Sequence, residues 1–211
     1  MKKFVLAAAM ALLASSVSAL DVQGVQLEDT VKVAGVELKI NGAGVRSAGA
    51  GKEVYVAGLY LPARSQSAEK TLASRQPKRV LLVLNRDLKI SVLNAAFRDG
   101  IGLNVTGAEM ERLGPSIAKL EQVMKNVPEA RAGERLVLDI LPDGSVVLNY
   151  KGQDLDTIPG PDIGPAMLKI WLGDVPVSDD LKNALLAGAR YGAKALRRKS
   201  AFDEVFDNIS L

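Results

Sequence analysis

The sequence predicts an α+β fold in which an antiparallel sheet carries helices on one face. Strand-like segments dominate residues 22–85, helical periodicity follows over residues 92–125, and a hairpin at residues 134–150 precedes further short helices. Strands and helices gathered in separate runs, rather than alternating, are typical of this class. The sequence shows no internal repeat, and its 211 residues fit one domain with a sizeable core.

The first half of the chain predicts the sheet. Apolar residues alternate loosely through residues 22–40, which indicates a β-hairpin or two short strands. Residues 53–61 predict a strand that Pro62 ends. Residues 68–73 predict a helical turn. Residues 79–85, RVLLVLN, are continuously apolar, as expected of a strand buried on both faces.

The period then changes from two to between three and four residues. This spacing predicts a helix over residues 92–103, with Ser91 as its N-cap. A second helix is predicted over residues 108–125. The Gly114-Pro115 pair inside it should kink or split it, because proline lacks the backbone N–H that a helix interior needs.

The last part of the domain begins with a hairpin. Pro142-Asp143-Gly144 separates the alternating segments 134–141 and 145–150, a strong hairpin signal. Residues 154–162 contain glycine and proline and are predicted as a loop. Two helices are predicted to follow, at residues 163–172 and, with Ser178 as N-cap, at residues 179–186.

The two ends of the chain differ from the domain. The chain begins MKKFVLAAAMALLASSVSA: a basic start, an apolar segment too short to span a bilayer comfortably, and a small-residue cleavage site. We therefore expect a signal peptide at residues 1–19, the alternative being an uncleaved anchor. Residues 20–188 form the predicted domain, and residues 189–211 a basic extension that is either a solvated tail or an interaction arm. The expected location is the periplasm of a bacterium, without stable membrane insertion.

Composition excludes several kinds of chemistry. The sequence contains neither cysteine nor histidine, so it has no disulfide, no Ser-His or Cys-His pair and no thiolate or imidazole ligand for zinc. The acidic segment 154–162 lacks a calcium ligand ladder, and we expect no metal or cofactor. Losing Lys2 and Lys3 with the signal takes two positive charges from a net charge of +3, so no field for nucleic acid is implied.

The candidate site lies in GAGVRSAGAGKEVYVAGLYLP, residues 42–62. Glycines and small residues flank Arg46, which suggests a tight turn. If a hairpin turns through residues 47–52, Arg46 stands opposite Glu53, and Tyr55 is its diagonal neighbour. A guanidinium and a phenol hydroxyl would then converge on one small anion. The alternative is an Arg46–Glu53 ion pair at the surface. Trp171, on an apolar helix, is most simply a core residue.

Four segments together resemble the chalcone isomerase family, and the resemblance as a whole covers roughly residues 22–188. The segments are NGAGVRSAGAGKEVYVAGLYLP, LNRDLKISVLNAAFRDGIGLN, PDGSVVLNYKG and IGPAMLKIWLGDVPVSDDLKNALL. The chain looks most like the exported bacterial branch of chalcone-isomerase-like proteins. The resemblance implies an open-faced β-sandwich, with a large antiparallel sheet, a helix layer against it and a ligand cleft between them.

The resemblance also implies site residues. True chalcone isomerases close a flavanone ring, and the arginine that guides the phenolate matches Arg46. The family's threonine position falls on Tyr55, and its other active-site tyrosine has no counterpart in residues 90–97. Related plant fatty-acid-binding proteins lack isomerase activity and hold the carboxylate with an arginine and a tyrosine, which Arg46 and Tyr55 match.

Three functions stay open at this point. The first is a non-catalytic protein that binds a fatty acid or similar amphiphilic carboxylate through Arg46 and Tyr55. The second is an intramolecular lyase or isomerase that acts on a chalcone-like, phenolic or other enone substrate with the same two residues. The third is an envelope protein that works through its basic C-terminal extension.

Overall fold

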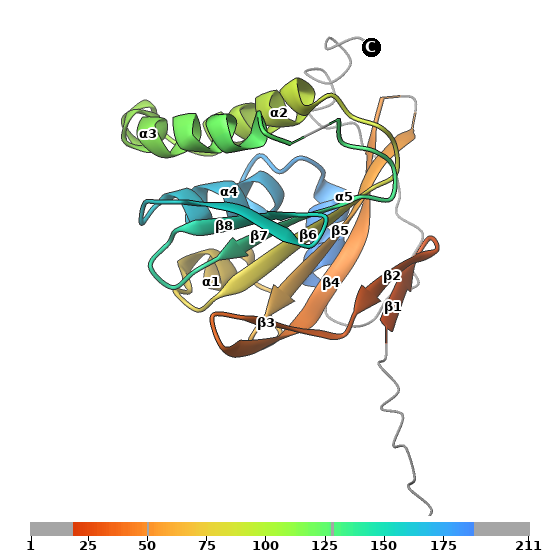
Figure 1. Ribbon diagram of the computed structural model, residues 1–211. Helices are drawn as coiled ribbons and strands as arrows, with labels where there is room; N and C mark the ends of the chain where they lie inside the picture. Colours follow the sequence, from red (N-terminus) through yellow and green to blue (C-terminus); the bar gives the residue numbers. More distant parts are fainter. Residues whose placement is uncertain (1–18, 50, 128, 188–211) are drawn as a thin grey trace, which may run out of the picture.

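A curled antiparallel sheet of seven strands, in the chain order β3-β4-β5-β6-β7-β8-β9, carries the fold (Figure 1). Its strands are β3 (Thr30–Val33), β4 (Val36–Ala48), β5 (Lys52–Leu61), β6 (Lys78–Leu84), β7 (Arg135–Ile140), β8 (Val146–Tyr150) and β9 (Gln153–Ile158). A separate hairpin, β1 (Ala19–Val22) and β2 (Val25–Glu28), precedes it. The helices are α1 (Ala68–Ala73), α2 (Ile90–Gly102), α3 (Gly107–Met124), α4 (Ile163–Leu172) and α5 (Asp179–Leu186).

This computed structural model describes residues 19–187 apart from residues 50 and 128. The predicted signal peptide at residues 1–19, except for Ala19, and the predicted basic extension at residues 189–211 lie outside the described residues. Within the described part of the chain, no helix combines the length and the apolar character needed to cross a membrane.

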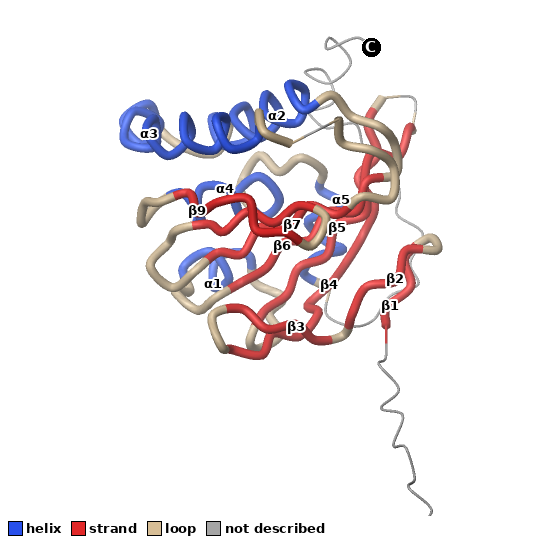
Figure 2. The backbone as a smooth tube through the Cα atoms, viewed as in Figure 1, coloured by secondary structure: helices blue, strands red, loops and turns tan. Residues whose placement is uncertain are grey.

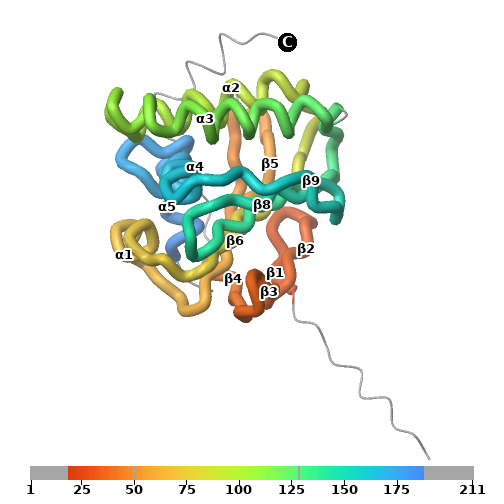
Figure 3. Tube along the Cα trace, turned by 60° about the vertical axis from the view of Figure 1, so that its left-hand side comes forward, coloured from red at the N-terminus to blue at the C-terminus, as the bar shows by residue number. Residues whose placement is uncertain are grey.

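The helices gather on one side of the sheet (Figure 2). The larger apolar cluster lies between them and the sheet, and includes Leu82, Ile101, Leu120 and Trp171. The smaller cluster lies on the opposite face, where side chains from β1 and β2 pack against it. Figure 3 shows α2 and α3 running side by side over one end of the sheet, and both elements contact α4. The predicted α+β class, with helices on one face, is confirmed.

The N-terminal part of the chain forms more strands than the loose apolar alternation predicted. Residues 19–48 form two successive hairpins, β1–β2 and β3–β4, rather than one hairpin or two short strands. Each turns through a pair of residues with positive φ, Gln23-Gly24 and Ala34-Gly35. Glycine takes up this left-handed conformation without steric cost, so both turns stay tight.

The structure corrects one predicted helix cap and shows that another helix, predicted to be kinked or split, is not split. Ser91 is not the N-cap of α2, because the helix starts at Ile90, two residues earlier than predicted, and Lys89 occupies the cap position without a side-chain hydrogen bond. Helix α3 is not split, and continues through Pro115. Its buried face and a capping box between Thr106 and Glu109 stabilise it, which offsets the hydrogen bond lost at the proline.

The predicted loop at residues 154–162 is also wrong in its first half. Residues 153–158 form β9, which pairs with β8 at the edge of the sheet. Its acidic side chains obscure the strand pattern, but charge on an exposed edge protects a sheet from pairing with other chains. Lys119 of α3 reaches across to Asp156 of β9, with 2.5 Å between Nζ and Oδ2.

Candidate ligand-binding site

The β4–β5 hairpin brings Arg46 and Tyr55 together. The two residues are direct cross-strand partners, because a bulge between Arg46 and Ser47 shifts the register beyond this point. Glu53 therefore lies opposite Ser47, and the predicted pairing of Arg46 with Glu53 is wrong. Directly opposed side chains lie closer than diagonal ones, with Cβ atoms about 4.5–5.5 Å apart. The bulge thus places the guanidinium and the phenol nearer each other than predicted.

The glycines before Arg46 do not form a tight turn. Gly42 and Gly44 lie inside β4, and the hairpin turns further on, where Gly49 and Gly51 have positive φ. Helix α5 explains the small residues. A Cβ at Gly42 would lie 2.3 Å from the carbonyl oxygen of Ala184. The helix backbone thus rests directly on the strand, on the same face as Arg46.

Arg46 is buried rather than a surface charge. Only 2% of the residue is exposed. Glu53, by contrast, is exposed and accepts a hydrogen bond from Asn85, with 3.2 Å between Nδ2 and Oε2. The surface ion pair considered from the sequence is therefore not the environment of Arg46.

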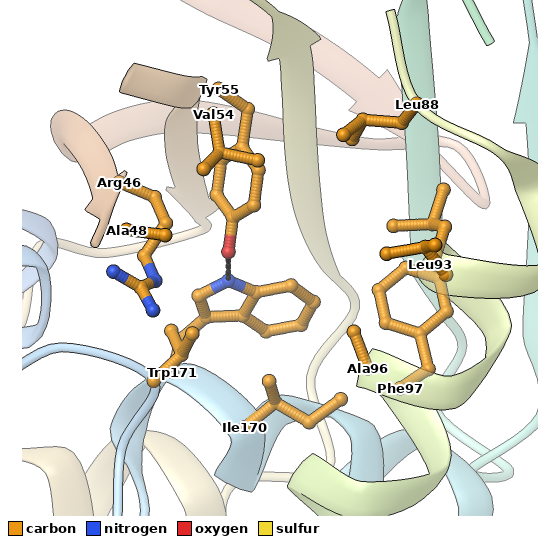
Figure 4. A pocket seen from close by; sticks show the side chains of 12 residues that line it. Arg46, Ala48, Val54, Tyr55, Leu88, Leu93, Ala96, Phe97, Ile170 and Trp171 are labelled. Atoms are coloured by element: carbon orange, nitrogen blue, oxygen red, sulfur yellow. Dashed lines mark hydrogen bonds between the residues drawn. The ribbon is translucent and has the colours of Figure 1, made fainter. Parts of the chain in front are cut away.

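Arg46 and Tyr55 line one cavity beneath the helices (Figure 4). The remaining lining comes from the end of the hairpin, from Leu88 before α2, from the first half of α2, from α4 and from the loop that follows α4. Apart from Arg46 and Tyr55, the lining residues are Ala48, Val54, Leu88, Val92, Leu93, Ala96, Phe97, Ile170, Trp171 and Val177. A cation and a hydroxyl therefore face an otherwise apolar chamber, the usual composition of a small-molecule site.

Trp171 joins the polar end of the cavity. Its indole Nε1–H donates a hydrogen bond to the Tyr55 hydroxyl, with 3.1 Å between Nε1 and Oη. Phe97 of α2 packs edge-on against the indole, with the ring centroids 6.3 Å apart. Trp171 is a core residue as predicted, only 1% exposed. Its contact with Tyr55 was missed, although a buried indole N–H generally needs a partner.

The environment keeps the Tyr55 phenol protonated. Burial raises its pKa above the ordinary value, and the positive charge of Arg46 and the hydrogen bond from Trp171 only partly oppose this effect. The hydroxyl therefore holds its proton at neutral pH and can donate it. Together with the guanidinium, it suits an oxygen that accepts hydrogen bonds, such as a carboxylate.

The described residues contain no group of three or more acidic side chains that could hold a metal ion. Among the described residues that line the cavity, Arg46 is the one cation and Tyr55 the one phenol, and none of them is a carboxylate. Its chemistry is therefore that of anion or oxygen recognition.

A curled antiparallel sheet, a helix layer on one face and a cavity between them define an open-faced sandwich. The chalcone isomerase-like family model matches residues 19–187, and the chain belongs to this family. A crystal structure of a fatty-acid binding protein from Arabidopsis thaliana is similar in fold, with a TM-score of 0.65 and 12% sequence identity over 80% of this chain and 96% of that chain. No curated protein matches the chain. The predicted family and sandwich type are confirmed.

Proposed function

We propose that this protein is a non-catalytic member of its family that binds a fatty acid or a similar amphiphilic carboxylate. Arg46 and Tyr55 hold the carboxylate, and the apolar walls take the adjoining carbon chain. The observation that carries the proposal is the direct pairing of these two residues at one end of an apolar cavity. A cation placed among apolar walls favours a ligand that has both an anionic head and an apolar body.

The Arabidopsis protein supports the same function. It is described as a fatty-acid binding protein, and it shares the fold that places this cavity between sheet and helices. At 12% identity the shared feature is the fold, so the residues that would hold the ligand have to come from this chain itself. Arg46 and Tyr55 supply them.

The cavity is small as it stands. The space open to the centre of a water molecule is about 20 Å³, and one water needs roughly 10–15 Å³ by this measure. An acyl chain needs far more room, so its entry requires wall side chains to move. We expect this movement at the start of α2, where half-buried Val92 and the more deeply buried Leu93 form the wall.

Calorimetric titration with dodecanoate tests the proposal, with methyl dodecanoate as the uncharged control. A charge-assisted hydrogen bond contributes about 1.5–3 kcal/mol, so Arg46→Ala should weaken dodecanoate binding roughly ten- to a hundred-fold. Tyr55→Phe removes a neutral hydroxyl and should cost about 0.5–1.5 kcal/mol, or roughly two- to tenfold. Arg64→Ala, at an exposed site, is the matched control and should bind like the wild type.

Two outcomes contradict the proposal. Equal affinity for the acid and its ester would remove the role of the charged head. Equal affinity of the wild type and Arg46→Ala for dodecanoate would show that the buried guanidinium does not contact the ligand. Unfolding curves of each variant show whether a loss of binding comes from a loss of fold.

We place this binding function in the periplasm, on the basis of the predicted signal peptide. Cleavage after Ala19 leaves Leu20 as the first residue. N-terminal sequencing of protein recovered from the periplasm should begin at Leu20. Recovery from the cytoplasm with Met1 retained would contradict both the signal peptide and the location.

A further inference from the structure

The hydroxyl of Tyr55 is held from a third element of the fold. Arg46 and Tyr55 come from adjacent strands, whereas Trp171 comes from α4, 116 residues further along the chain than Tyr55. The Trp171 indole packs against Phe97, and residue Tyr55 is only 7% exposed. In Figure 4 the indole N–H points at the phenol oxygen from below, beside the Arg46 guanidinium.

This contact decides the direction of the Tyr55 hydrogen bond. A phenol hydroxyl can donate one hydrogen bond and accept others at the same time, but an indole N–H can only donate. Because the Tyr55 oxygen accepts from Trp171, its own proton has to point elsewhere. The cavity that both residues line is the space beside it. An acceptor atom placed there can take this proton.

We propose that Trp171 is a positioning residue that makes Tyr55 a hydrogen-bond donor into the cavity, and thereby selects ligands that present an acceptor oxygen. This inference rests on the proposed binding function and narrows it. A carboxylate meets the guanidinium and the donated phenol proton together. The ammonium head of a fatty amine would instead meet the Arg46 cation and a hydroxyl oriented to donate, so the site disfavours it.

The hydrogen bond itself can be measured without any ligand. Trp171 is the only tryptophan of the chain, so ¹⁵N-labelled protein gives a single indole N–H signal in an NMR spectrum. Tyr55→Phe removes the acceptor, and we expect this signal to move upfield and to exchange with solvent faster. Tyr60→Phe is the matched control, because Tyr60 lies on the same strand in the cluster on the opposite face. An unchanged signal in Tyr55→Phe would overturn the inference.

A double-mutant cycle tests whether Trp171 acts through Tyr55. Trp171→Phe keeps an aromatic ring and removes the N–H donor. It should weaken dodecanoate binding about two- to tenfold in the wild-type background. In the Tyr55→Phe background the same substitution should have little effect, because there is no hydroxyl left to orient. An equal loss in both backgrounds would show that Trp171 only packs, and would overturn the inference.

Two further comparisons complete the test. If Trp171→Phe unfolds, benzothienylalanine at position 171 keeps the shape of the indole and replaces its N–H by sulfur, and the same cycle applies. Dodecylamine should bind the wild type at least tenfold more weakly than dodecanoate. Equal binding of the two would overturn the inference that the site selects ligands with an acceptor oxygen. Equal binding of dodecanoate and methyl dodecanoate would instead overturn the proposed function, and the NMR comparison would still decide whether Trp171 positions Tyr55.

Discussion

At the scale of single residues, the β-bulge after Arg46 is the feature that builds the site. If the register of Ser47 and Glu53 continued without this bulge, Arg46 would lie opposite Val54 and not opposite Tyr55. A buried arginine is costly unless its donors are satisfied. Its planar fork matches the two oxygens of a carboxylate, which a point charge does not. The shape of the cation should therefore matter as well as its charge.

Arg46→Lys tests this point. Lysine keeps the positive charge but loses the planar fork, so the variant should bind dodecanoate more tightly than Arg46→Ala and about three- to tenfold more weakly than the wild type. Calorimetry on the three proteins in one buffer provides the comparison. Wild-type affinity in Arg46→Lys would mean that only the charge is recognised.

A second prediction at the residue scale concerns Glu134 and the pH dependence of stability. Its carboxylate accepts hydrogen bonds from the Lys151 ammonium (2.8 Å), the Tyr150 hydroxyl and the Arg131 backbone N–H (2.9 Å), which lower its pKa from 4.5 to about 2. The Glu134 carboxylate therefore binds a proton more tightly in the unfolded chain than in the folded chain. The stabilisation is complete above about pH 4.5 and disappears as the pH falls towards 2.

Glu134→Gln should remove this pH dependence. The free energy of unfolding of the wild type should exceed that of the variant by up to about 3 kcal/mol at pH 7, and the difference should shrink steadily below pH 4.5. Denaturant unfolding at a series of pH values measures this difference, with Glu69→Gln, at an exposed position of α1, as the control. Two parallel curves for wild type and Glu134→Gln would show that the contacts of Glu134 do not affect stability.

At the scale of elements, the contact between α5 and β4 shapes the helix-facing side of the hairpin. Gly42 and Gly44, four and two residues before Arg46, let α5 lie directly against the strand. Asn41, fully buried at the neighbouring irregularity of β4, donates to the Leu185 carbonyl oxygen of α5 at 2.8 Å. Close backbone packing and this hydrogen bond together fix the helix against the strand that carries Arg46.

Gly42→Ala should therefore destabilise the protein strongly. The added Cβ meets backbone rather than a flexible side chain, at 2.3 Å from the Ala184 oxygen. Overpacking of this kind costs about 1–3 kcal/mol or more. Gly102→Ala, at the end of α2 with nothing within 4 Å of the new Cβ, is the control and should be neutral or slightly stabilising. Equal unfolding midpoints for the two variants would contradict close packing of α5 on β4.

At the scale of the whole molecule, the fold separates the cavity from the second apolar cluster. The helices and the concave part of the sheet enclose the cavity, and the β1–β2 hairpin packs on the opposite face. Membership of the chalcone isomerase-like family does not decide whether this protein is an enzyme. The shape and lining of the cavity have to decide it. Tyr55 occupies the position that the resemblance assigns to a smaller threonine, and the remaining room is close to that of one or two waters.

We therefore expect little or no isomerisation of chalcones. Loss of chalcone absorbance in the presence of the protein should follow the spontaneous rate, because the substrate's ketone end is crowded by the Tyr55 ring. Arg46→Ala is run beside the wild type to identify any catalysis that depends on the site. Turnover well above the spontaneous rate that Arg46→Ala abolishes would establish an intramolecular lyase in place of the binding protein.

Local sequence patterns were sufficient for the fold class and for most helices and strands, and together with the family resemblance they pointed to the two residues of the candidate site. Periodicity reports which face of an element is buried, and glycine and proline mark where elements end. The helix at residues 163–172 and the Ser178 cap of α5 are accurate for this reason. The absence of cysteine and histidine narrowed the chemistry without any structure.

Only the tertiary structure decided which residues of different elements lie opposite one another. The bulge after Arg46, the carbonyl oxygen above Gly42 and the indole N–H that meets Tyr55 all depend on segments far apart in the chain. A pattern of apolar residues shows that Trp171 is buried, but not which side chain its N–H faces. Such contacts arise when β4, β5, α4 and α5 pack together, because packing selects one register and one set of neighbours from many that the same periodicity allows.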